Sequence, residues 1–186
     1  MKHFSLPEDG GICINDVPSD ILHACDKIYT DSFLDQDSAA DEIVSRIIRT
    51  VKNFFTESPA AKFKLGFSTG SSPVPVYDKL AQAYAEGEIS FRDIEIYSTD
   101  EFYAPDGKTN QRRSTPLVTH LIEKIDVLPE NVHLLDGTVD HNEVSSYCAD
   151  FDAKARNIDL LVMGLGEKGQ VGFNEMGAEK YSRTRS

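Results

Sequence analysis

Small and polar residues gather in three short segments, each of which follows an apolar run of the chain. The first segment reads Ser68-Thr69-Gly70-Ser71-Ser72-Pro73. Glycine lets a backbone approach an anion closely, and hydroxyl groups can surround phosphate oxygens together with the amides that open a following helix. A P-loop is excluded because the Gly-Lys-Ser/Thr ending is missing. The segment predicts a phosphate site, and an ordinary capped turn is the alternative.

The second segment, Asp100-Glu101-Phe102-Tyr103, places two adjacent acids directly after a short apolar run. Carboxylates at the end of a buried strand are costly unless they are solvated or used. One of them could act as a general base that moves a proton between carbons next to a carbonyl. A solvated loop or a helix cap is the alternative.

The third segment, Gly164 to Gly169, matches the GxGxxG pattern. A dinucleotide fold needs this pattern in its first strand-to-helix turn, with a helix, a strand and an acid about 20 residues further on. Here it follows the last predicted strand, so a dinucleotide site is not expected. The residues after it, Gln170 to Glu175 and Ser182 to Arg185, are more distinctive.

These segments need a scaffold of alternating strands and helices. Apolar residues recur at helical spacing from Ala40 to Phe55, and further helices are expected at about 74–86, after Ser114, and after Asp140 or Asn142. Short apolar runs predict strands at 63–67, 94–97, 132–135 and 158–163. The run at 158–163 is nearly all apolar, so a central strand that is buried on both faces is expected there. Alternation of this kind predicts an α/β fold with a mainly parallel sheet and ligands beyond the carboxyl ends of the strands.

Composition and charge narrow the classes of function. The 186 residues are 40% hydrophobic and 27% charged, which is typical of one globular domain. The net charge of −12 argues against nucleic acid and anionic membrane surfaces as partners. No apolar run is long enough to span a bilayer, the first residues do not resemble a secretory signal, and the three cysteines show no CxxC spacing, so a cytoplasmic protein is expected.

Several motifs occur together in one order, and in this the chain resembles the glucosamine-6-phosphate deaminase (isomerase) family, whose wider superfamily includes 6-phosphogluconolactonase. The resemblance runs from about Lys27 to Ser186 and leaves 1–26 as an N-terminal extension before a sugar-phosphate isomerase-like domain at 27–186. It rests on Phe67 to Pro73, Thr99 to Phe102, Met163 to Gly166 with Gly169, and Phe173 to Glu175 with Ser182 to Arg185. The Phe-Asn-Glu element is similar to the deaminase branch rather than to the lactonase branch.

The resemblance implies a three-layer α/β/α sandwich of Rossmann-like type and a phosphorylated aminosugar as ligand. It implies conversion of an aminosugar phosphate to a ketose phosphate and ammonia through an enediol-like intermediate, without metal or organic cofactor. Asp100 corresponds to the base that moves the proton between C1 and C2, and Glu175 to the acid that supports a ring-opening histidine. The residues that correspond to the ligand-binding and phosphate-binding positions are Ser68, Thr69, Gly70, Ser71, Ser72, Gly166 and Gly169.

This chain departs from the family pattern at the ring-opening loop. Gln170 stands at the histidine position and Lys168 at the position of the preceding acid. Glutamine can donate a hydrogen bond, but it does not titrate near neutral pH, so a loss of about 10²- to 10⁴-fold in rate is expected.

A second departure is length, because family members continue past Ser182 to Arg185 with further strands and helices. The expectation is therefore a fold whose C-terminal part is missing, with an uncovered sheet that favours association, such as a homo-oligomer. Three functions stay open: an impaired deaminase, a non-catalytic sugar-phosphate-binding domain, and a 6-phosphogluconolactonase-like hydrolase.

Overall fold

The computed structural model describes residues 31–104, 112–164, 172–173 and 184. Contacts divide the chain into two units, Met1–Ala39 and Ala40–Ser186. The first described helix, Gln36–Glu57, begins in the first unit, and all later described elements belong to the second unit. The predicted boundary between an extension at 1–26 and a domain at 27–186 falls outside the described residues and stays a prediction.

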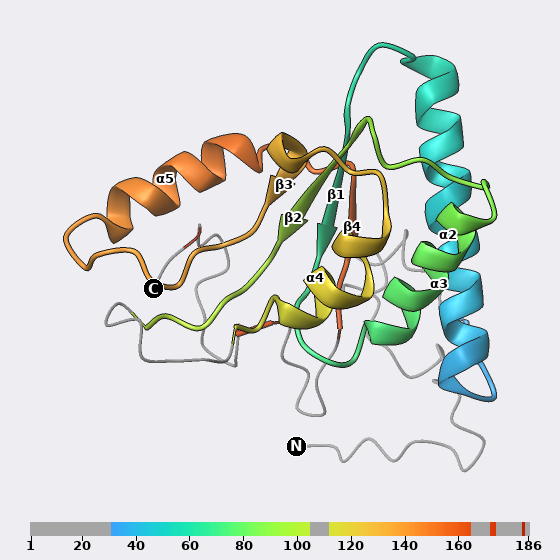
Figure 1. Ribbon diagram of the computed structural model, residues 1–186, viewed down its shortest axis with the longest axis horizontal. Coiled ribbons are helices and arrows are strands. Elements are labelled where there is room, and N and C mark those ends of the chain that lie inside the picture. The colour runs from blue at the N-terminus through green and yellow to red at the C-terminus, as the bar shows by residue number, and fades with distance from the viewer. Residues whose placement is uncertain (1–30, 105–111, 165–171, 174–183, 185–186) are drawn as a thin grey trace, which may run out of the picture. The chain divides into compact units, whose positions relative to one another are not determined.

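Helices and strands alternate along the second unit, as the sequence predicts (Figure 1). A long helix comes first, and four strands follow with helices between them. In chain order the elements are α2 (Gln36–Glu57), β1 (Phe63–Phe67), α3 (Val74–Ala85), β2 (Ile94–Ser98), α4 (Thr115–His120), the 3-10 helices η2 (Ile122–Lys124) and η3 (Pro129–Asn131), β3 (Val132–His133), α5 (Val144–Lys154) and β4 (Leu160–Val162).

The four strands form one parallel sheet in the order β3-β2-β1-β4. In the β1–β2 pair, Phe63 lies opposite Ile94 and Phe67 lies opposite Ser98. Both strands therefore end at the same level of the sheet. The predicted α/β fold with a mainly parallel sheet is confirmed.

Alternation of side chains along β1 and β2 assigns the helices to the two faces of the sheet. On one face, Phe63 packs edge-on against Phe54 of α2, and Phe67 packs edge-on against Tyr77 of α3. On the other face, Tyr97 contacts Phe151 of α5 and its hydroxyl donates to the carbonyl of Lys154. Helices cover both faces, so the predicted three-layer α/β/α arrangement is confirmed.

Apolar burial is uneven between the two faces. The α2 and α3 side holds a continuous core that includes Ile47, Leu65, Leu80 and Ile96, each exposed by 1% or less. Leu117 of α4 and Leu121 just after it join this core. None of the residues of α5 is fully buried, so the α5 side is packed more openly. The layer formed by α2 and α3 therefore supplies most of the apolar packing that holds β1 and β2.

The last strand corrects one expectation from the sequence. The apolar run 158–163 predicted a central strand buried on both faces, but β4 pairs with β1 alone among the described strands and stands at the edge of their sheet. Leu161 and Met163 are 43% and 41% exposed. The prediction was wrong because an apolar run indicates contact with other apolar groups and does not fix how many strands flank it.

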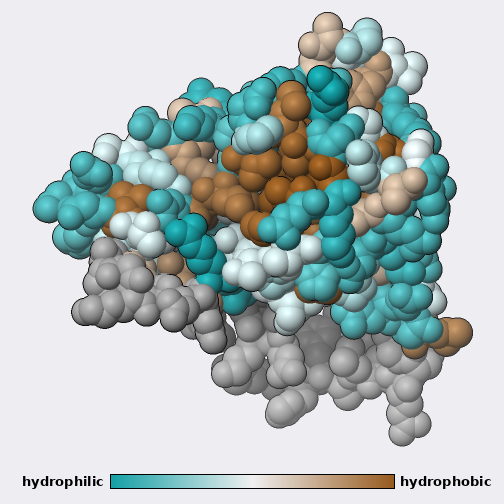
Figure 2. All heavy atoms as spheres, in the orientation of Figure 1, coloured by the Kyte–Doolittle hydropathy of each residue, from teal (hydrophilic) through white to brown (hydrophobic). Residues whose placement is uncertain are grey.

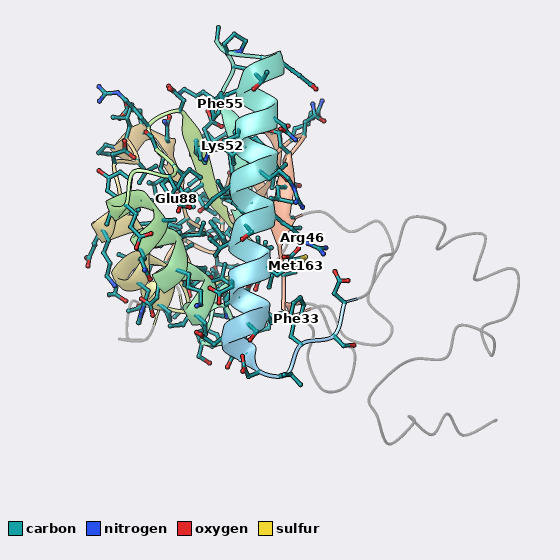
Figure 3. The ribbon with its side chains drawn as sticks, turned by 90° about the vertical axis from the view of Figure 1, so that its right-hand side faces the viewer. Phe33, Arg46, Lys52, Phe55, Glu88 and Met163 are labelled. Atoms are coloured by element: carbon teal, nitrogen blue, oxygen red, sulfur yellow. The ribbon has the colours of Figure 1, made fainter. Side chains whose placement is uncertain are left out.

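The surface of the described residues is largely hydrophilic on the face that Figure 2 shows, with one apolar area near its centre. Figure 3 shows α2 in front of the sheet, with Lys52 and Phe55 near its end and Glu88 beside them. These residues border an open hollow of about 550 Å³ at the end of the sheet where the strands begin. No helix in the described part of the chain is long and apolar enough to cross a membrane.

Candidate active site

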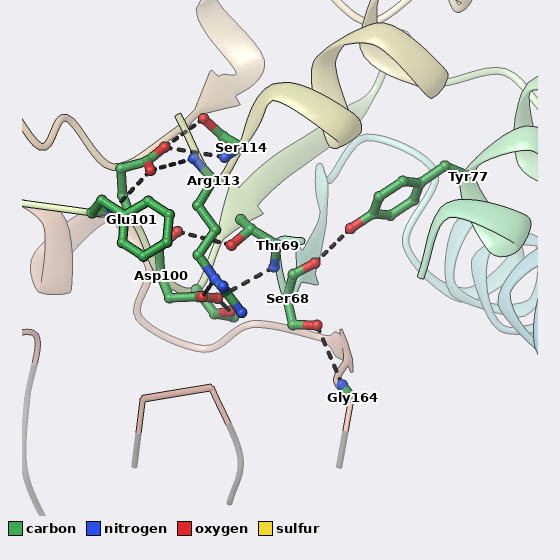
Figure 4. Close-up of polar contacts among 10 residues, drawn as sticks. Ser68, Thr69, Tyr77, Asp100, Glu101, Arg113, Ser114 and Gly164 are labelled. Atoms are coloured by element: carbon green, nitrogen blue, oxygen red, sulfur yellow. Dashed lines mark hydrogen bonds and ion pairs between the residues drawn. The ribbon is translucent and has the colours of Figure 1, made fainter. Parts of the chain in front are cut away.

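The Ser/Thr/Gly loop and the two adjacent acids meet at the carboxyl ends of β1 and β2 (Figure 4). Phe67 and Ser98 are paired, and the amide of Thr99 donates to the carbonyl of Phe67 at 3.0 Å. Thr69 and Asp100 are therefore in contact although they are 31 residues apart in the chain. This is the end of a parallel sheet at which α/β proteins bind ligands.

Ser68 ties the loop to its neighbours. Its amide donates to the carbonyl of Val162 at 2.8 Å, and its hydroxyl accepts from the amide of Gly164 at 3.2 Å. Its carbonyl accepts the hydroxyl of Tyr77 on α3. Burial and the nearby charge of Asp100 raise the pKa of Tyr77, so this phenol stays protonated as a donor. Ser68 thus fixes the ends of β1 and β4 to each other and to α3.

The second half of the loop turns toward solvent. Gly70 has a φ of +99°, in the region that favours glycine, and its amide donates to the carbonyl of Arg113 at 3.2 Å. Ser71 and Ser72 are exposed just before α3 begins at Val74. The loop therefore has a buried part, Ser68 and Thr69, and an exposed part that a dissolved anion can reach.

Asp100 is held by contacts to both carboxylate oxygens, and its exposed fraction is 6%. Oδ1 accepts from the hydroxyl of Thr99 at 2.7 Å and from the amide of Thr69 at 3.3 Å. Oδ2 accepts from Nε of Arg113 in an ion pair. Burial by itself raises the pKa of Asp100, but the hydrogen bonds from Thr99, Arg113 and Thr69 outweigh it and hold the pKa below its ordinary value. The carboxylate is ionised at neutral pH.

Glu101, the neighbouring acid, has a different environment. One of its oxygens accepts from the amides of Phe102 and Arg113 at 2.8 and 2.6 Å. The other accepts from the amide and the hydroxyl of Ser114 at 3.1 and 2.6 Å. Ser114 directly precedes α4 and makes no side-chain capping bond of its own. Glu101 therefore acts as the cap of α4, and Asp100 is the acid that faces the loop.

Arg113 joins these parts, and its role was not predicted from the sequence. Its guanidinium carbon lies 4.8 Å from the ring centre of Phe173 and 5.6 Å from that of Phe102. A Cβ added to Gly70 would lie 3.4 Å from Nη2 of Arg113. A sequence signal did exist, because a cation just before a helix opposes the helix dipole and so calls for another partner.

The remaining predicted site residues lie outside the described residues. These are Gly166, Lys168, Gly169, Gln170 and Glu175. Phe173 is described, and its contact with Arg113 shows where the Phe-Asn-Glu segment begins relative to Asp100. The roles assigned to the five residues stay predictions.

Among the described residues, no group of three or more His, Cys, Asp or Glu side chains is placed to hold a metal ion. The charged groups around Asp100 in this part of the chain are Arg113 and Glu101. The arrangement therefore holds the carboxylate of Asp100 next to the polar Ser68–Pro73 loop. It can accept a proton at that carboxylate and meet an anion at the exposed side of the loop.

Comparison with known proteins identifies relatives of this chain. The model of the family described as "Glucosamine-6-phosphate isomerases/6-phosphogluconolactonase" matches residues 34–172. Glucosamine-6-phosphate deaminase 2 of Xenopus tropicalis is 33% identical over 161 residues, which cover 85% of this chain and 56% of that protein. Glucosamine-6-phosphate deaminase of Porphyromonas gingivalis is 35% identical over 150 residues, which cover 79% of this chain and 54% of that protein. The chain spans about half the length of the relatives it matches.

Solved structures show the same fold. A monomeric glucosamine-6-phosphate deaminase superimposes with a TM-score of 0.74 at 21% identity, covering 85% of this chain and 64% of that one. A 6-phosphogluconolactonase of Thermotoga maritima superimposes with a TM-score of 0.60 at 24% identity, covering 72% of this chain and 59% of that one. The family model matches one continuous stretch of more than half the chain, and the chain therefore belongs to the family of glucosamine-6-phosphate isomerases and 6-phosphogluconolactonases.

Proposed function

We propose that this chain acts on an aminosugar 6-phosphate by the deaminase reaction, with Asp100 as the base. The observation that supports this most directly is the ionised, buried carboxylate of Asp100 in contact with Thr69 of the Ser68–Pro73 loop. The relatives that match at 33–35% identity are glucosamine-6-phosphate deaminases, which supports the same choice.

The reaction begins on the open-chain sugar, whose C2 carries the amino group and whose C1 is an aldehyde. Asp100 removes the C2 proton, the electrons form the C1–C2 double bond of an enediol-type (enolamine) intermediate, and O1 takes up a proton from the ammonium group at C2. The proton is returned to C1, which leaves an imine at C2. Water adds to the imine and releases ammonia, so the products are a ketose 6-phosphate and ammonia. Asp100 ends the cycle ionised, as it began.

The phosphate is proposed to lie at the exposed part of the loop, against Gly70, Ser71 and Ser72. The positive φ of Gly70 supports this, because the backbone there can approach an anion without a side chain in the way. Ser68 and Thr69 are proposed to act beneath it, since both are buried and hydrogen-bonded within the protein.

Ring opening is the step in which this chain is proposed to be weak. Gln170 and Lys168 stand where the family has a histidine and an acid, and Glu175 is proposed to support the same loop. Gln170 cannot exchange a proton near neutral pH, so opening of the pyranose ring would depend on the spontaneous reaction. We propose that slow ring opening, rather than the chemistry at C2, limits the rate.

A non-catalytic sugar-phosphate-binding domain is the second candidate, and the same pair of replacements favours it. This candidate keeps the loop and gives Lys168 the role of a cation for an anionic ligand. It predicts binding of glucosamine 6-phosphate without turnover, and loss of binding in Gly70→Val, because a side chain there meets Arg113 and an unfavourable φ.

Turnover of glucosamine 6-phosphate separates the candidates. The assay follows ammonia and fructose 6-phosphate for the wild-type chain and for the double variant Gln170→His/Lys168→Asp. The deaminase proposal predicts that the double variant is faster by about 10²- to 10⁴-fold. Absence of turnover in both, with binding retained, would replace it by the binding domain.

Hydrolysis of 6-phosphogluconolactone, measured in parallel, tests the remaining alternative. The net charge of −12 supports the proposal that neither nucleic acid nor an anionic membrane is a partner. A cytoplasmic location and a reaction without metal or organic cofactor are proposed from the resemblance to the family. Formation of a homo-oligomer is a proposal supported by the exposed Leu161 and Met163 at and just beyond β4.

A further inference from the structure

Arg113 is the residue that connects Asp100, Gly70 and Glu101 in the candidate site. Its Nε pairs with Oδ2 of Asp100, its carbonyl accepts from the amide of Gly70, and its amide donates to Glu101 at 2.6 Å. The residue is thus fixed at its backbone by two partners and at its side chain by a third.

Two aromatic rings hold the guanidinium group in place. Phe173 lies 4.8 Å and Phe102 lies 5.6 Å from its central carbon, both within the range of cation–π contacts. These rings are 53% and 44% exposed, and the Arg113 side chain is 29% exposed. The ion pair is therefore shielded on the side of Asp100 and reachable from solvent on the other side.

Few other charges compete for Asp100. Among the described residues, Glu101 directs its carboxylate at the start of α4, and Tyr77 on α3 is neutral because burial raises its pKa. The ends of β1 and β4 contribute hydroxyl and amide groups near Ser68 but no charge. Arg113 is the cation that faces Asp100 from this part of the chain.

We infer that Arg113 is a positioning residue, which keeps the Asp100 carboxylate ionised and fixed against the Ser68–Pro73 loop for the reaction proposed above. The planar guanidinium fork and its aromatic neighbours fix the direction of the bond, which a flexible ammonium group does less well. The inference rests on the proposed function for its consequence in catalysis, whereas the pairing itself is a property of the protein alone.

The ion pair with Arg113 fixes the direction in which the pKa of Asp100 should change when Arg113 is replaced. An opposite charge in contact lowers the pKa of a carboxyl group, typically by about 1 to 3 units. Loss of Arg113 therefore raises the pH at which Asp100 takes up its proton. Between the old and the new value, wild-type Asp100 is a base and the Asp100 of the variant is a neutral acid.

The test is a carboxyl ¹³C NMR titration of Asp100, assigned with Asp100→Asn. It compares wild type, Arg113→Met and Arg113→Lys, each verified as folded by circular dichroism. The titration midpoint of Asp100 is expected to rise by about 1 to 3 pH units in Arg113→Met and to return part of the way in Arg113→Lys. Lys124→Met is the matched control: Lys124 contacts Asp78 at 3.3 Å, so the midpoint of Asp78 should rise while that of Asp100 does not.

An unchanged Asp100 midpoint in folded Arg113→Met overturns the inference. If that variant does not fold, the wild type decides, because a midpoint at or above the ordinary value near 3.9 also overturns it. The acid limb of deaminase turnover is expected to move with the NMR midpoint. Absence of turnover in both the wild type and Gln170→His/Lys168→Asp, together with the expected NMR shift, would refute the proposed function and leave the pairing established.

Discussion

Asp100 and Glu101 are neighbours in sequence, and their partners give them different tasks. Asp100 meets two hydroxyl-bearing residues and one guanidinium. Glu101 accepts the amide of Phe102 and, at the start of α4, two amides and one hydroxyl. The sequence allowed two roles for these adjacent acids, a general base and a helix cap. Each acid fits one of the two roles. Asp100 is the proposed base, and Glu101 is the cap.

Removal of the cap tests the task of Glu101. In Glu101→Ala the amides of Arg113 and Ser114 lose their acceptor, and Ser114 makes no capping bond to replace it. We expect the free energy of unfolding to fall by about 0.5 to 2 kcal/mol, measured by urea denaturation. Glu57→Ala, an exposed acid at the end of α2, is the control and should change it by less than about 0.5 kcal/mol. Equal losses in both variants would contradict the capping task.

Asp100 should also make stability depend on pH. Its pKa in the folded chain lies below the ordinary value, so its ionised form stabilises the fold above the unfolded value and this contribution is lost as pH falls through the folded value. The difference in unfolding free energy between wild type and Asp100→Asn should be constant from pH 6 to 7. It should shrink below about pH 4.

Urea unfolding at several pH values measures that difference. Asp78→Asn provides a comparison, because Asp78 also has a lowered pKa but is largely exposed, where salt screens its pairs with His120 and Lys124. A difference for Asp100→Asn that grows as the solution becomes more acidic would be the wrong sign and would refute a lowered pKa.

At the residue scale, sequence reasoning found groups whose chemistry is local and missed one whose role is not. Ser68 to Pro73 and Asp100 stand next to recognisable strands, so their place at the sheet edge follows from the parallel pattern. Arg113 acts through partners 13 and 43 residues away and through the ring of Phe173. Nothing in its immediate sequence states which acid it meets.

The elements of the core next to the candidate site were predicted closely, and the later elements were not. β1, α3 and β2 have nearly the predicted bounds. The helix after Ser114 ends at His120, because Leu121 leaves helical geometry with φ of −127°. The run 132–135 yields a strand of two residues, and the run 158–163 yields an edge strand. Apolar side chains mark burial, whereas tertiary packing decides where hydrogen-bonded pairing stops.

Contact between β1 and β4 provides a test at the scale of the element. A Cβ on Gly66 would lie 2.5 Å from Cδ1 of Leu161, so a side chain at this position requires the Leu161 side chain to move. Gly66→Val should lower the unfolding free energy by about 0.5 to 1.5 kcal/mol, because the Leu161 side chain must leave its preferred rotamer. In a Leu161→Ala background the loss should be smaller, and a double-mutant cycle in urea measures the coupling. Equal losses in both backgrounds would show that the two residues do not constrain each other.

For the whole molecule, the fold is shared with relatives along most of this chain, while the matched stretch covers only a little over half of the length of those relatives. The chain holds the loop and the carboxylate that the proposed reaction uses at C2. Gln170 and Lys168 replace the pair proposed to open the ring. Ring opening, the step proposed to be weakened, thus depends on residues other than Asp100, which is proposed to carry out the intact step at C2.

Exchange of the C2 proton of glucosamine 6-phosphate with deuterium oxide tests the role of Asp100 most directly, because it depends on the base and not on release of ammonia. Proton NMR follows the C2 signal in wild type, Asp100→Asn and the control Asp78→Asn. The expected result is exchange in wild type and Asp78→Asn, and a rate lower by at least about 10²-fold in Asp100→Asn. Equal exchange in Asp100→Asn and wild type, or none in wild type with ligand bound, would contradict Asp100 as the base.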